Sequence, residues 1–421
     1  MLDIKFIREN PEAVRAAAAQ KNMSIDLDGI IALDQQRREN VQEAERLKQK
    51  LNATTAEIAK KKKAGEKADD LIAEMREVSQ RIGRMDEHIR QIESDLSTKL
   101  LWVPNIPDAS IPVGDESANR EVRSWGEPPT FSFTPAPHWE LGEKLRILDL
   151  TRGAKISGSG FFVLIGRGAR LQRALINFMI DRHARAGYTE VRPPYLVTPG
   201  SMTGTGQLPK LEEDMYRLDK EDLYLIPTGE VPVTNLHAQE TFRAEELPLK
   251  YVSYTPCFRR EAGAHGKDTR GMIRVHQFDK VELVKIVRPE TSYDELELLV
   301  ADAEDILQSL ELPHRVRLLA TGDLSFAAAK CYDLEVWAPG VGAYLEVSSC
   351  SNFLDFQARR MNTRFRPAPQ EKLQFVHTLN GSGLALPRTV IALLENHQTE
   401  KGTVRIPAKL RPYLDGADEI A

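Results

Sequence analysis

Residues 254–282 read YTPCFRREAGAHGKDTRGMIRVHQFDKVE, which is the most informative stretch of the chain. The pattern predicts two strands joined by a hairpin loop over 262–271, which is rich in glycine and charge. Side chains alternate along a strand, so Arg274, Phe278 and Glu282 share one face over about 27 Å. A guanidinium suits a phosphate, a ring suits a base and a carboxylate suits an ammonium. The stretch therefore predicts either a site for a molecule such as an aminoacyl adenylate or, more simply, a solvated hairpin face.

Composition sets the broad class of the protein. The chain has 421 residues, of which 41% are hydrophobic and 28% are charged, so we expect a soluble protein of two or three domains. No run of eighteen apolar residues predicts a transmembrane helix, and the first residues resemble neither a signal peptide nor a transit peptide. The net charge of −5 argues against a globally basic nucleic-acid binder. Any contact with nucleic acid must therefore use a local patch.

The cysteines indicate the compartment. Cys257, Cys331 and Cys350 form no CxxC pair, so neither a disulfide framework nor a zinc site is expected. We therefore predict a cytoplasmic location, where thiols stay reduced.

Two long helices are predicted near the N-terminus. After a short helix opened by Asn10 and Pro11, helical patterns cover about 27–63 and about 68–100. The second pattern has a heptad stripe formed by Leu71, Met75, Val78, Ile82, Met85, Ile89, Ile92 and Leu96. The short turn between the helices forces them to pair antiparallel, as a coiled-coil arm of roughly 50–55 Å.

The tip of this arm is basic. Residues 46–67 contain eight basic and two acidic residues, a local charge of +6. Lys60, Lys61, Lys62 and Lys63 are the candidates to grip a phosphate backbone. A solvated helical tip, or a coiled coil that joins two protein chains, would explain the same pattern.

Beyond the arm the pattern changes twice. Residues 103–137 are rich in proline and predict an extended linker, and a body follows over 138–421. After an amphipathic helix over 170–187, strands are predicted near 223–226, 251–259, 272–287, 315–320, 333–338 and 344–348. Strands that follow one another through turns favour an α+β body with an antiparallel sheet flanked by helices. Glycine-rich phosphate loops are absent from the sequence, so side chains would have to hold any ATP.

Several motifs resemble those of class II aminoacyl-tRNA synthetases. The helix and prolines ending at Pro193 resemble motif 1, the FRRE hairpin resembles motif 2, and GSGLALPRTVIALLENHQ at 381–398 resembles motif 3. TGE at 228–230, EVSS at 346–349 and NGSG at 380–383 are similar to seryl-specific segments. With the arm, the resemblance to the bacterial-type seryl-tRNA synthetases covers nearly the whole chain. It implies a class II antiparallel sheet and a division into a tRNA-binding domain (1–102), a linker (103–137) and a catalytic domain (138–421).

The resemblance implies a ligase that uses ATP and Mg²⁺ to form seryl-adenylate and then charges tRNA-Ser. Arg259 would hold the α-phosphate, and Phe278 would stack on adenine with Arg388 on its other face. Glu346 and Ser349 would hold Mg²⁺, since oxygen donors suit that cation. The implied catalytic residues are Arg259, Glu346 and Arg388. The implied ATP site comprises Arg259, Arg260, Glu261, Arg274, Val275, Phe278, Glu346, Val347, Ser348, Ser349 and Arg388.

Serine recognition must depend on its hydroxyl, the one group that alanine lacks. By resemblance, Glu230 and Glu282 would take the ammonium, and Glu282 with Ser382 would take the hydroxyl. The implied serine site comprises Thr228, Gly229, Glu230, Arg259, Glu282, Asn380 and Ser382. Taken singly, these Ser, Thr and Asn residues are as typical of turns and caps. Gly229 and Arg260 stand where the family more often has Ala and Ser, which leaves the shape of the serine site open.

The resemblance also implies partners. It predicts a homodimer whose arm reads the long variable arm of tRNA-Ser, with selenocysteine tRNA as a further candidate substrate. Three alternatives stay open at the level of sequence. They are an amino acid ligase that charges a carrier protein, a non-enzymatic adaptor built on a degenerate synthetase, and a resistance copy that tolerates a serine-adenylate mimic.

Overall fold

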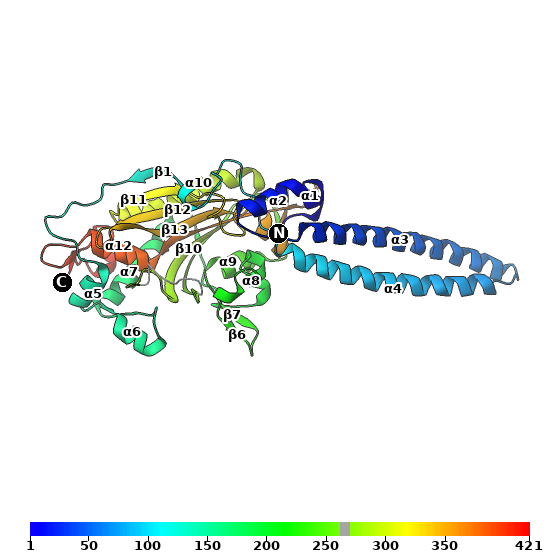
Figure 1. Cartoon of the computed structure of the whole chain (residues 1–421), viewed down its shortest axis with the longest axis horizontal. Coiled ribbons are helices and arrows are strands. Elements are labelled where there is room, and N and C mark those ends of the chain that lie inside the picture. The colour runs from blue at the N-terminus through cyan, green and yellow to red at the C-terminus, as the bar shows by residue number, and fades with distance from the viewer. Residues whose placement is uncertain (262–269) are drawn as a thin grey trace. The chain divides into compact units, whose positions relative to one another are not determined.

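The computed structural model describes residues 1–261 and 270–421 (Figure 1). They form two compact units, one of residues 2–104 and one of residues 105–421 together with Met1. Most of the hairpin loop predicted at 262–271 lies outside the described residues. None of the described helices is both long and apolar enough to cross a membrane.

The smaller unit contains four helices, α1 (Ile4–Glu9), α2 (Pro11–Gln20), α3 (Leu27–Lys63) and α4 (Asp69–Leu100). The two long helices, α3 and α4, pair side by side (Figure 1), as the sequence predicts. Asn10 is the N-cap of α2 as expected, but its side chain donates back to Phe6 O and does not cap the helix.

The heptad stripe of α4 faces α3. Met75, Ile82, Ile92 and Leu96 are buried and the other four stripe positions are partly buried, while Gly83 is exposed. Burial of this apolar stripe is what stabilises a long helical pair.

Asp34 interrupts the apolar pattern of α3, and it is also buried. Its carboxylate lies 2.7 Å from Arg8, 3.7 Å from Arg37 and 3.2 Å from Arg38. A buried carboxylate needs such partners, so the interruption is an ion-pair cluster at the base of the arm.

The larger unit is built on a sheet. Its helices are α5 (His138–Lys144), α6 (Leu150–Ser157), α7 (Arg167–Arg185), α8 (Pro199–Thr205), α9 (Glu230–Thr234), α10 (Ser292–Ser309), α11 (Phe356–Met361) and α12 (Leu386–Asn396), with 3-10 turns η1 (Glu116–Ala118), η2 (Glu212–Asp214), η3 (Asn235–His237), η4 (Ala244–Glu246), η5 (Pro289–Thr291) and η6 (Arg411–Leu414). The strands of the main sheet are β1 (Arg120–Trp125), β4 (Thr189–Glu190), β9 (Leu249–Phe258), β10 (Gln277–Val287), β11 (His314–Leu318), β12 (Lys330–Ala338), β13 (Ala343–Asn352) and β16 (His377–Ala385). The short strands are β2 (Leu148–Asp149), β3 (Val163–Leu164), β5 (Leu196–Val197), β6 (Arg217–Leu218), β7 (Leu223–Leu225), β8 (Thr241–Arg243), β14 (Arg364–Arg366), β15 (Gln374–Phe375), β17 (Val404–Arg405) and β18 (Glu419–Ile420).

Among the described residues the main sheet has the order β1-β11-β12-β13-β16-β10-β9-β4. All neighbours pair antiparallel except β4 and β9, which confirms the predicted α+β class. Two details differ from the prediction. β10 begins at Gln277 and not at 272, and the NGSG motif lies inside β16, a central strand that the sequence did not reveal.

Alternation separates the two faces of the central strands. Lys285 points toward α10, where its ammonium lies 2.9 Å from the carboxylate of Glu295. Gly383 faces His183 of α7. The helices α7 and α10 therefore cover one face, and the even-numbered residues Phe278, Lys280 and Glu282 of β10 point to the other.

The proline-rich range contributes to the sheet. Within it, β1 pairs with β11, and Arg123 makes a forked contact with the carboxylate of Glu304 on α10. The residues predicted as a linker thus supply an edge strand, because an extended chain can pair with an open sheet edge even when prolines flank it.

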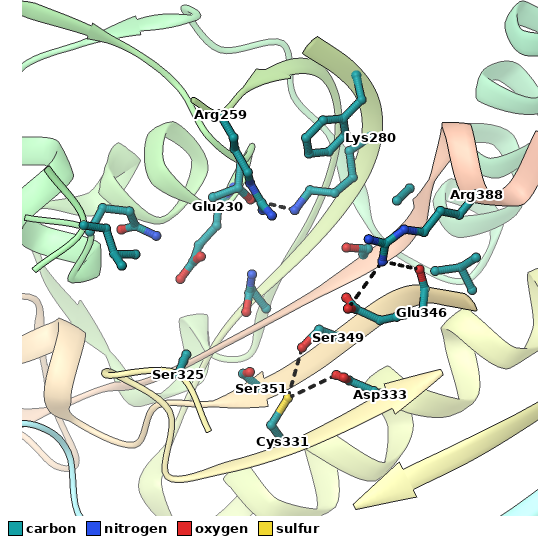
Figure 2. A pocket seen from close by; sticks show the side chains of 18 of the residues that line it. Glu230, Arg259, Lys280, Ser325, Cys331, Asp333, Glu346, Ser349, Ser351 and Arg388 are labelled. Atoms are coloured by element: carbon teal, nitrogen blue, oxygen red, sulfur yellow. Dashed lines mark hydrogen bonds and ion pairs between the residues drawn. The ribbon is translucent and has the colours of Figure 1, made fainter. Parts of the chain in front are cut away.

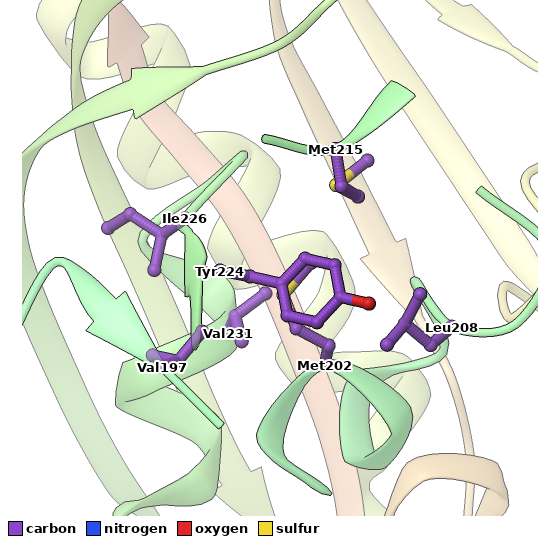
Figure 3. Close-up of a cluster of buried hydrophobic side chains, with 7 residues drawn as sticks. All are labelled: Val197, Met202, Leu208, Met215, Tyr224, Ile226 and Val231. Atoms are coloured by element: carbon purple, nitrogen blue, oxygen red, sulfur yellow. The ribbon is translucent and has the colours of Figure 1, made fainter. Parts of the chain in front are cut away.

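A small apolar core supports one wall of the sheet's open face. It joins β5, α8, β7 and α9, and Figure 3 shows its side chains around the ring of Tyr224. Its buried members are Val197, Met202, Leu208, Met215, Tyr224, Ile226 and Val231. The chain runs from Ile226 through Pro227 to Thr228, so this packing fixes where the TGE motif begins.

Candidate active site

A cavity of about 430 Å³ opens on the face of the sheet that α7 and α10 leave free (Figure 2). Side chains from four strands, from α12 and from the TGE segment line it. It brings together thirteen predicted site residues, Thr228, Glu230, Arg259, Glu261, Arg274, Val275, Phe278, Glu346, Val347, Ser349, Asn380, Ser382 and Arg388.

Arg259 follows the end of β9 and reaches into the cavity. Its Nε donates to Pro227 O at 3.2 Å, and its guanidinium carbon lies 5.3 Å from the centre of the Phe278 ring. The cation that lies over this ring is therefore Arg259, while the placement of adenine between Phe278 and Arg388 stays a prediction. One backbone contact and one ring contact preset the guanidinium before any substrate arrives.

The two charged residues that flank the hairpin loop pair with each other. Arg274 NH1 donates to Glu261 Oε2 at 2.8 Å. Glu261 has a φ of 50°, in the left-handed region that non-glycine residues adopt only rarely. The carboxylate thus orients one of the three arginines of the cavity.

Arg388 enters the cavity from the first turn of α12. Its Nε donates to Ile273 O at 3.1 Å and its NH1 donates to Glu346 O at 2.8 Å, and the Glu346 carboxylate lies 3.4 Å away (Figure 2). Three segments far apart in sequence, motif 3, the hairpin and β13, therefore meet at one guanidinium.

Bulges decide which side chains face the cavity. The register of β12 with β13 shifts so that Val347 is the extra residue between Glu346 and Ser349. The register of β10 with β16 shifts in the same way around Gly383. Strict alternation would point Glu346 and Ser349 to opposite faces, and the bulge brings both to the same one.

The other end of the cavity holds a network around Glu282. The Thr228 hydroxyl donates to Glu282 Oε2 at 2.8 Å and the Asn380 amide donates to Oε1 at 3.0 Å. The Lys280 ammonium pairs with Oε2 and donates to Thr228 Oγ1 at 2.8 Å. Glu282 is 1% exposed, so this buried carboxylate has the partners that burial demands.

The burial of the Glu230 carboxylate is less well offset by hydrogen bonds and nearby cations than that of Glu282. Gln357 donates to its Oε1 at 2.6 Å, and it is 6% exposed at the start of α9. Burial, reinforced by the nearby charge of Glu282, raises the pKa of Glu230 to about 7. This carboxyl can therefore change its protonation state near neutral pH.

Gly229 makes room for Glu282. A Cβ added at this position would lie 3.1 Å from the Cβ of Glu282 and 3.1 Å from the hydroxyl of Thr255. The glycine in the TGE motif therefore relieves a close contact at the base of the network.

The predicted Mg²⁺ ligands present suitable donors. The carboxylate of Glu346 is half exposed, and the Ser349 hydroxyl lies 3.1 Å from Cys331 Sγ, close to Asp333 (Figure 2). Burial and the charge of Glu346 raise the pKa of Asp333 well above its usual range. No three His, Cys, Asp or Glu side chains in the described part of the chain form a metal cage. Two oxygen donors fit Mg²⁺, because this ion takes most remaining ligands from water and phosphates.

Some predicted residues lie outside the cavity. Arg260 lines a separate hollow with Arg217 and the acidic turn at 212–214. Ser348 is buried and its hydroxyl donates to Ser382 O, so it supports a neighbouring strand. Gly229 lies behind the cavity wall, and the buried carboxylate of Glu282 lies within that wall, in contact with the lining residues Thr228, Lys280 and Asn380. The lysines at 60–63 belong to the other unit, in the last turn of α3.

The structure adds residues that the sequence did not single out. Lys280 had a signal, since it falls between Phe278 and Glu282 on the same face of β10. Asp333 and Gln357 had none, because the contacts that bring them here join segments distant in sequence.

Comparisons with known proteins agree with this geometry. The family described as tRNA synthetase class II core domain (G, H, P, S and T) matches residues 211–397, and the seryl-tRNA synthetase N-terminal domain matches residues 1–107. The serine–tRNA ligase of Heliobacterium modesticaldum is 59% identical over 100% of both chains. That of Desulfitobacterium hafniense is 55% identical over 98% of this chain and 99% of its own.

Solved structures agree as well. The crystal structure of seryl-tRNA synthetase from Pyrococcus horikoshii complexed with ATP superposes with a TM-score of 0.94 at 42% identity, covering 100% of this chain and 99% of that one. Both units and the cavity between motifs 2 and 3 are thus accounted for by one family, and the chain belongs to the seryl-tRNA synthetases, the serine–tRNA ligases of class II.

Proposed function

We propose that this chain activates L-serine with ATP to give seryl-adenylate and pyrophosphate, and then transfers the seryl group to the 3′ end of tRNA-Ser. One observation carries the proposal, a single cavity with two chemically different ends. Three arginines line one end, and a buried network of carboxylates, hydroxyls and an amide forms the other. The first suits a triphosphate, and the second suits an amino acid with a hydroxyl.

In the first step an oxygen of the serine carboxylate attacks the α-phosphorus. The bond from that phosphorus to the bridging oxygen breaks, and pyrophosphate leaves with the electron pair. Negative charge gathers where carboxylate and phosphate meet, and Arg259 would stand there. Its guanidinium is already anchored by Pro227 O, so it stabilises this charge with little reorganisation.

An aromatic ring and two guanidinium groups would hold the nucleotide. Phe278 supplies a face for the adenine, Arg274 and Arg388 contact the phosphates, and Glu261 orients Arg274. Mg²⁺, held by Glu346 and Ser349, would supply neutralisation of phosphate charge.

In the second step the terminal adenosine hydroxyl of the tRNA attacks the seryl carbonyl, and AMP leaves. The tip lysines 60–63 would contact phosphates of the long variable arm, a shape-based mode that suits double-stranded RNA. We further propose that the enzyme is a homodimer and works in the cytoplasm.

Exchange of pyrophosphate with ATP tests the first step. Serine should support the exchange and alanine, glycine and threonine should not. Charging of tRNA-Ser, with tRNA-Sec as a second substrate, then tests the transfer with and without residues 27–100. Exchange driven by another amino acid, or by none, would overturn the assignment, whereas full charging without the arm would remove only the role of the arm.

Arg259→Lys is the sharper variant, because it keeps the charge and removes the fork. We expect the kcat of exchange to fall by about 10²-fold, the cost of losing one preorganised donor. Arg217→Lys, in the separate hollow, is the matched control and should leave kcat unchanged.

A further inference from the structure

Lys280 is a buried cation inside the cavity that has no role in the reaction described above. Its side chain is 7% exposed and projects from β10 into the cavity (Figure 2). Along the strand it stands between Phe278 and Glu282, on the same face. Burying a lysine costs free energy unless its charge is paired and its donors are satisfied. The neighbours of Lys280 must therefore offset the cost of burying its charge.

Lys280 fixes the direction of the Thr228 hydroxyl proton. An ammonium can only donate, so at 2.8 Å the Thr228 oxygen must accept from it. The same oxygen also accepts from the backbone N–H of Glu230 at 3.2 Å. Both of its acceptor positions are then filled, and its one proton must point to Glu282 Oε2, which lies 2.8 Å away.

One acceptor position on the Glu282 carboxylate stays open. Among the residues that the structure describes, Oε2 receives the Thr228 hydroxyl and the Lys280 ammonium, while Oε1 receives only the Asn380 amide. Each carboxylate oxygen has two lone pairs, so Oε1 keeps one open acceptor position. A substrate donor that reaches this carboxylate therefore finds one oxygen occupied and one available.

The charges of the buried groups in the pocket also indicate a role for Lys280. Glu230 and Glu282 are both buried, and Lys280 is the buried cation beside them. With both carboxylates ionised the three groups carry a net charge of −1, which one substrate ammonium neutralises. Without Lys280 the same pocket would carry −2, and the two carboxylates would repel each other.

We propose that Lys280 is a positioning residue of the serine pocket. It locks the Thr228 hydroxyl and one oxygen of Glu282, so that the remaining oxygen of Glu282 is presented to the hydroxyl of the amino acid. Lys280 thus sets discrimination between serine and alanine without touching the phosphates. This inference deepens the proposed function and rests on it.

The test compares Lys280→Met with the wild-type enzyme in ATP–pyrophosphate exchange, using serine and alanine in turn. In the variant we expect the serine KM to rise and the serine-to-alanine ratio of kcat/KM to fall, each by about tenfold or more, as for loss of a charged hydrogen bond. The KM for ATP should change less than about twofold, because the arginine end is intact.

Two further variants keep the test decisive. Lys285→Met removes a buried cation from the opposite face of the same strand, where Glu295 and Asp302 are its partners. It should lower the melting temperature and leave the serine-to-alanine ratio unchanged. Lys280→Gln keeps a donor without the charge and should recover part of the ratio, and it replaces Lys280→Met if that variant does not fold.

The outcomes separate the two proposals. Wild-type enzyme without serine-dependent exchange would overturn the proposed function itself. Active wild-type enzyme with an unchanged ratio in folded Lys280→Met would overturn only the role of Lys280. An equal loss of affinity for ATP and serine would also contradict it, because a positioning role is confined to the serine end.

Discussion

At the scale of single residues, the two buried carboxylates of the serine pocket differ in their partners. Glu282 receives three donors, whereas Gln357 is the partner that most clearly compensates Glu230. The pKa of Glu230 therefore rises to about 7, above the ordinary value of a glutamate. Between these two values the folded state binds a proton that the unfolded state does not. This contribution to stability is present at low pH and is lost as the pH rises to about 7.

The raised pKa of Glu230 predicts opposite pH trends for serine use and for stability. The kcat/KM for serine should rise between about pH 6 and pH 8, because only the ionised carboxylate attracts the ammonium. Over the range from about pH 4.5 to about pH 7, the free energy of unfolding should fall by about 3 kcal/mol relative to Glu230→Gln. Exchange kinetics and urea titrations measure the two trends. Identical pH profiles for wild type and Glu230→Gln would refute this account of Glu230.

At the scale of elements, one buried pair ties the hairpin to α12. The backbone N–H of Met272 donates to His138 Nε2 at 3.0 Å, so the ring proton lies on Nδ1 and donates to Glu395 at 2.9 Å. Glu395 also accepts from the backbone N–H groups of Gly340 and Val341. The segment that carries Arg274 is thus held to the same helix that carries Arg388.

His138→Phe should loosen this attachment, because it leaves Met272 N–H without a partner and removes the ring donor to Glu395, whose Oε1 then keeps only the backbone N–H of residue 138 among its described donors. We expect the free energy of unfolding to fall by about 2–4 kcal/mol and the KM for ATP to rise several-fold. The exposed His88, changed to Phe, serves as control. An ATP KM equal to that of wild type would show that the pair is only structural.

Gly83 in the arm allows a prediction in the stabilising direction. It is exposed within α4, and an added Cβ would meet nothing within 4 Å. Gly83→Ala should therefore stabilise the arm by about 1 kcal/mol through helix propensity alone. Hydrogen exchange of the α4 amides should slow accordingly. Exchange that quickens or stays the same would mean that the glycine has a packing role.

Periodicity predicted much of the fold but not the way the sheet presents its residues. The heptad stripe predicted α4 nearly to the residue, and the helical pattern that precedes it predicted α3, because a long apolar stripe on a helix must be buried against a partner. Strand β16 was not predicted from the sequence, because NGSG has a composition typical of turns. The bulges at Val347 and Gly383 were not predicted either, because a register shift depends on the partner strand. The motifs named most cavity residues, yet Asp333 and Gln357 depend on tertiary contacts.

At the scale of the whole molecule, the arm tip that is proposed to bind tRNA differs in charge from the chain as a whole. The chain carries a net charge of −5, while residues 46–67 carry +6. Within the described range, Lys48 and Lys50 pair with Asp86 and Glu74 of α4, and Lys61 lies 3.6 Å from Glu57. Lys60, Lys62 and Lys63 form no ion pair there, so they are the lysines best placed to meet phosphate.

Changing Lys60, Lys62 and Lys63 to Gln should raise the KM for tRNA-Ser several-fold and weaken its salt dependence, because fewer counterions are released. Serine-dependent pyrophosphate exchange should stay at the wild-type rate. Lys48→Gln with Lys50→Gln is the matched control, since those lysines are paired within the arm. Equal tRNA kinetics in both variants would remove the tip from the tRNA contact.

The most direct measurement is a crystal structure of the protein with a nonhydrolysable seryl-adenylate analogue. We expect the purine on the Phe278 ring, the linking group at Arg259 and the serine hydroxyl at Glu282 Oε1. A purine bound elsewhere, or a serine hydroxyl away from Glu282, would contradict the claim that side-chain cations and one buried carboxylate network do the recognition.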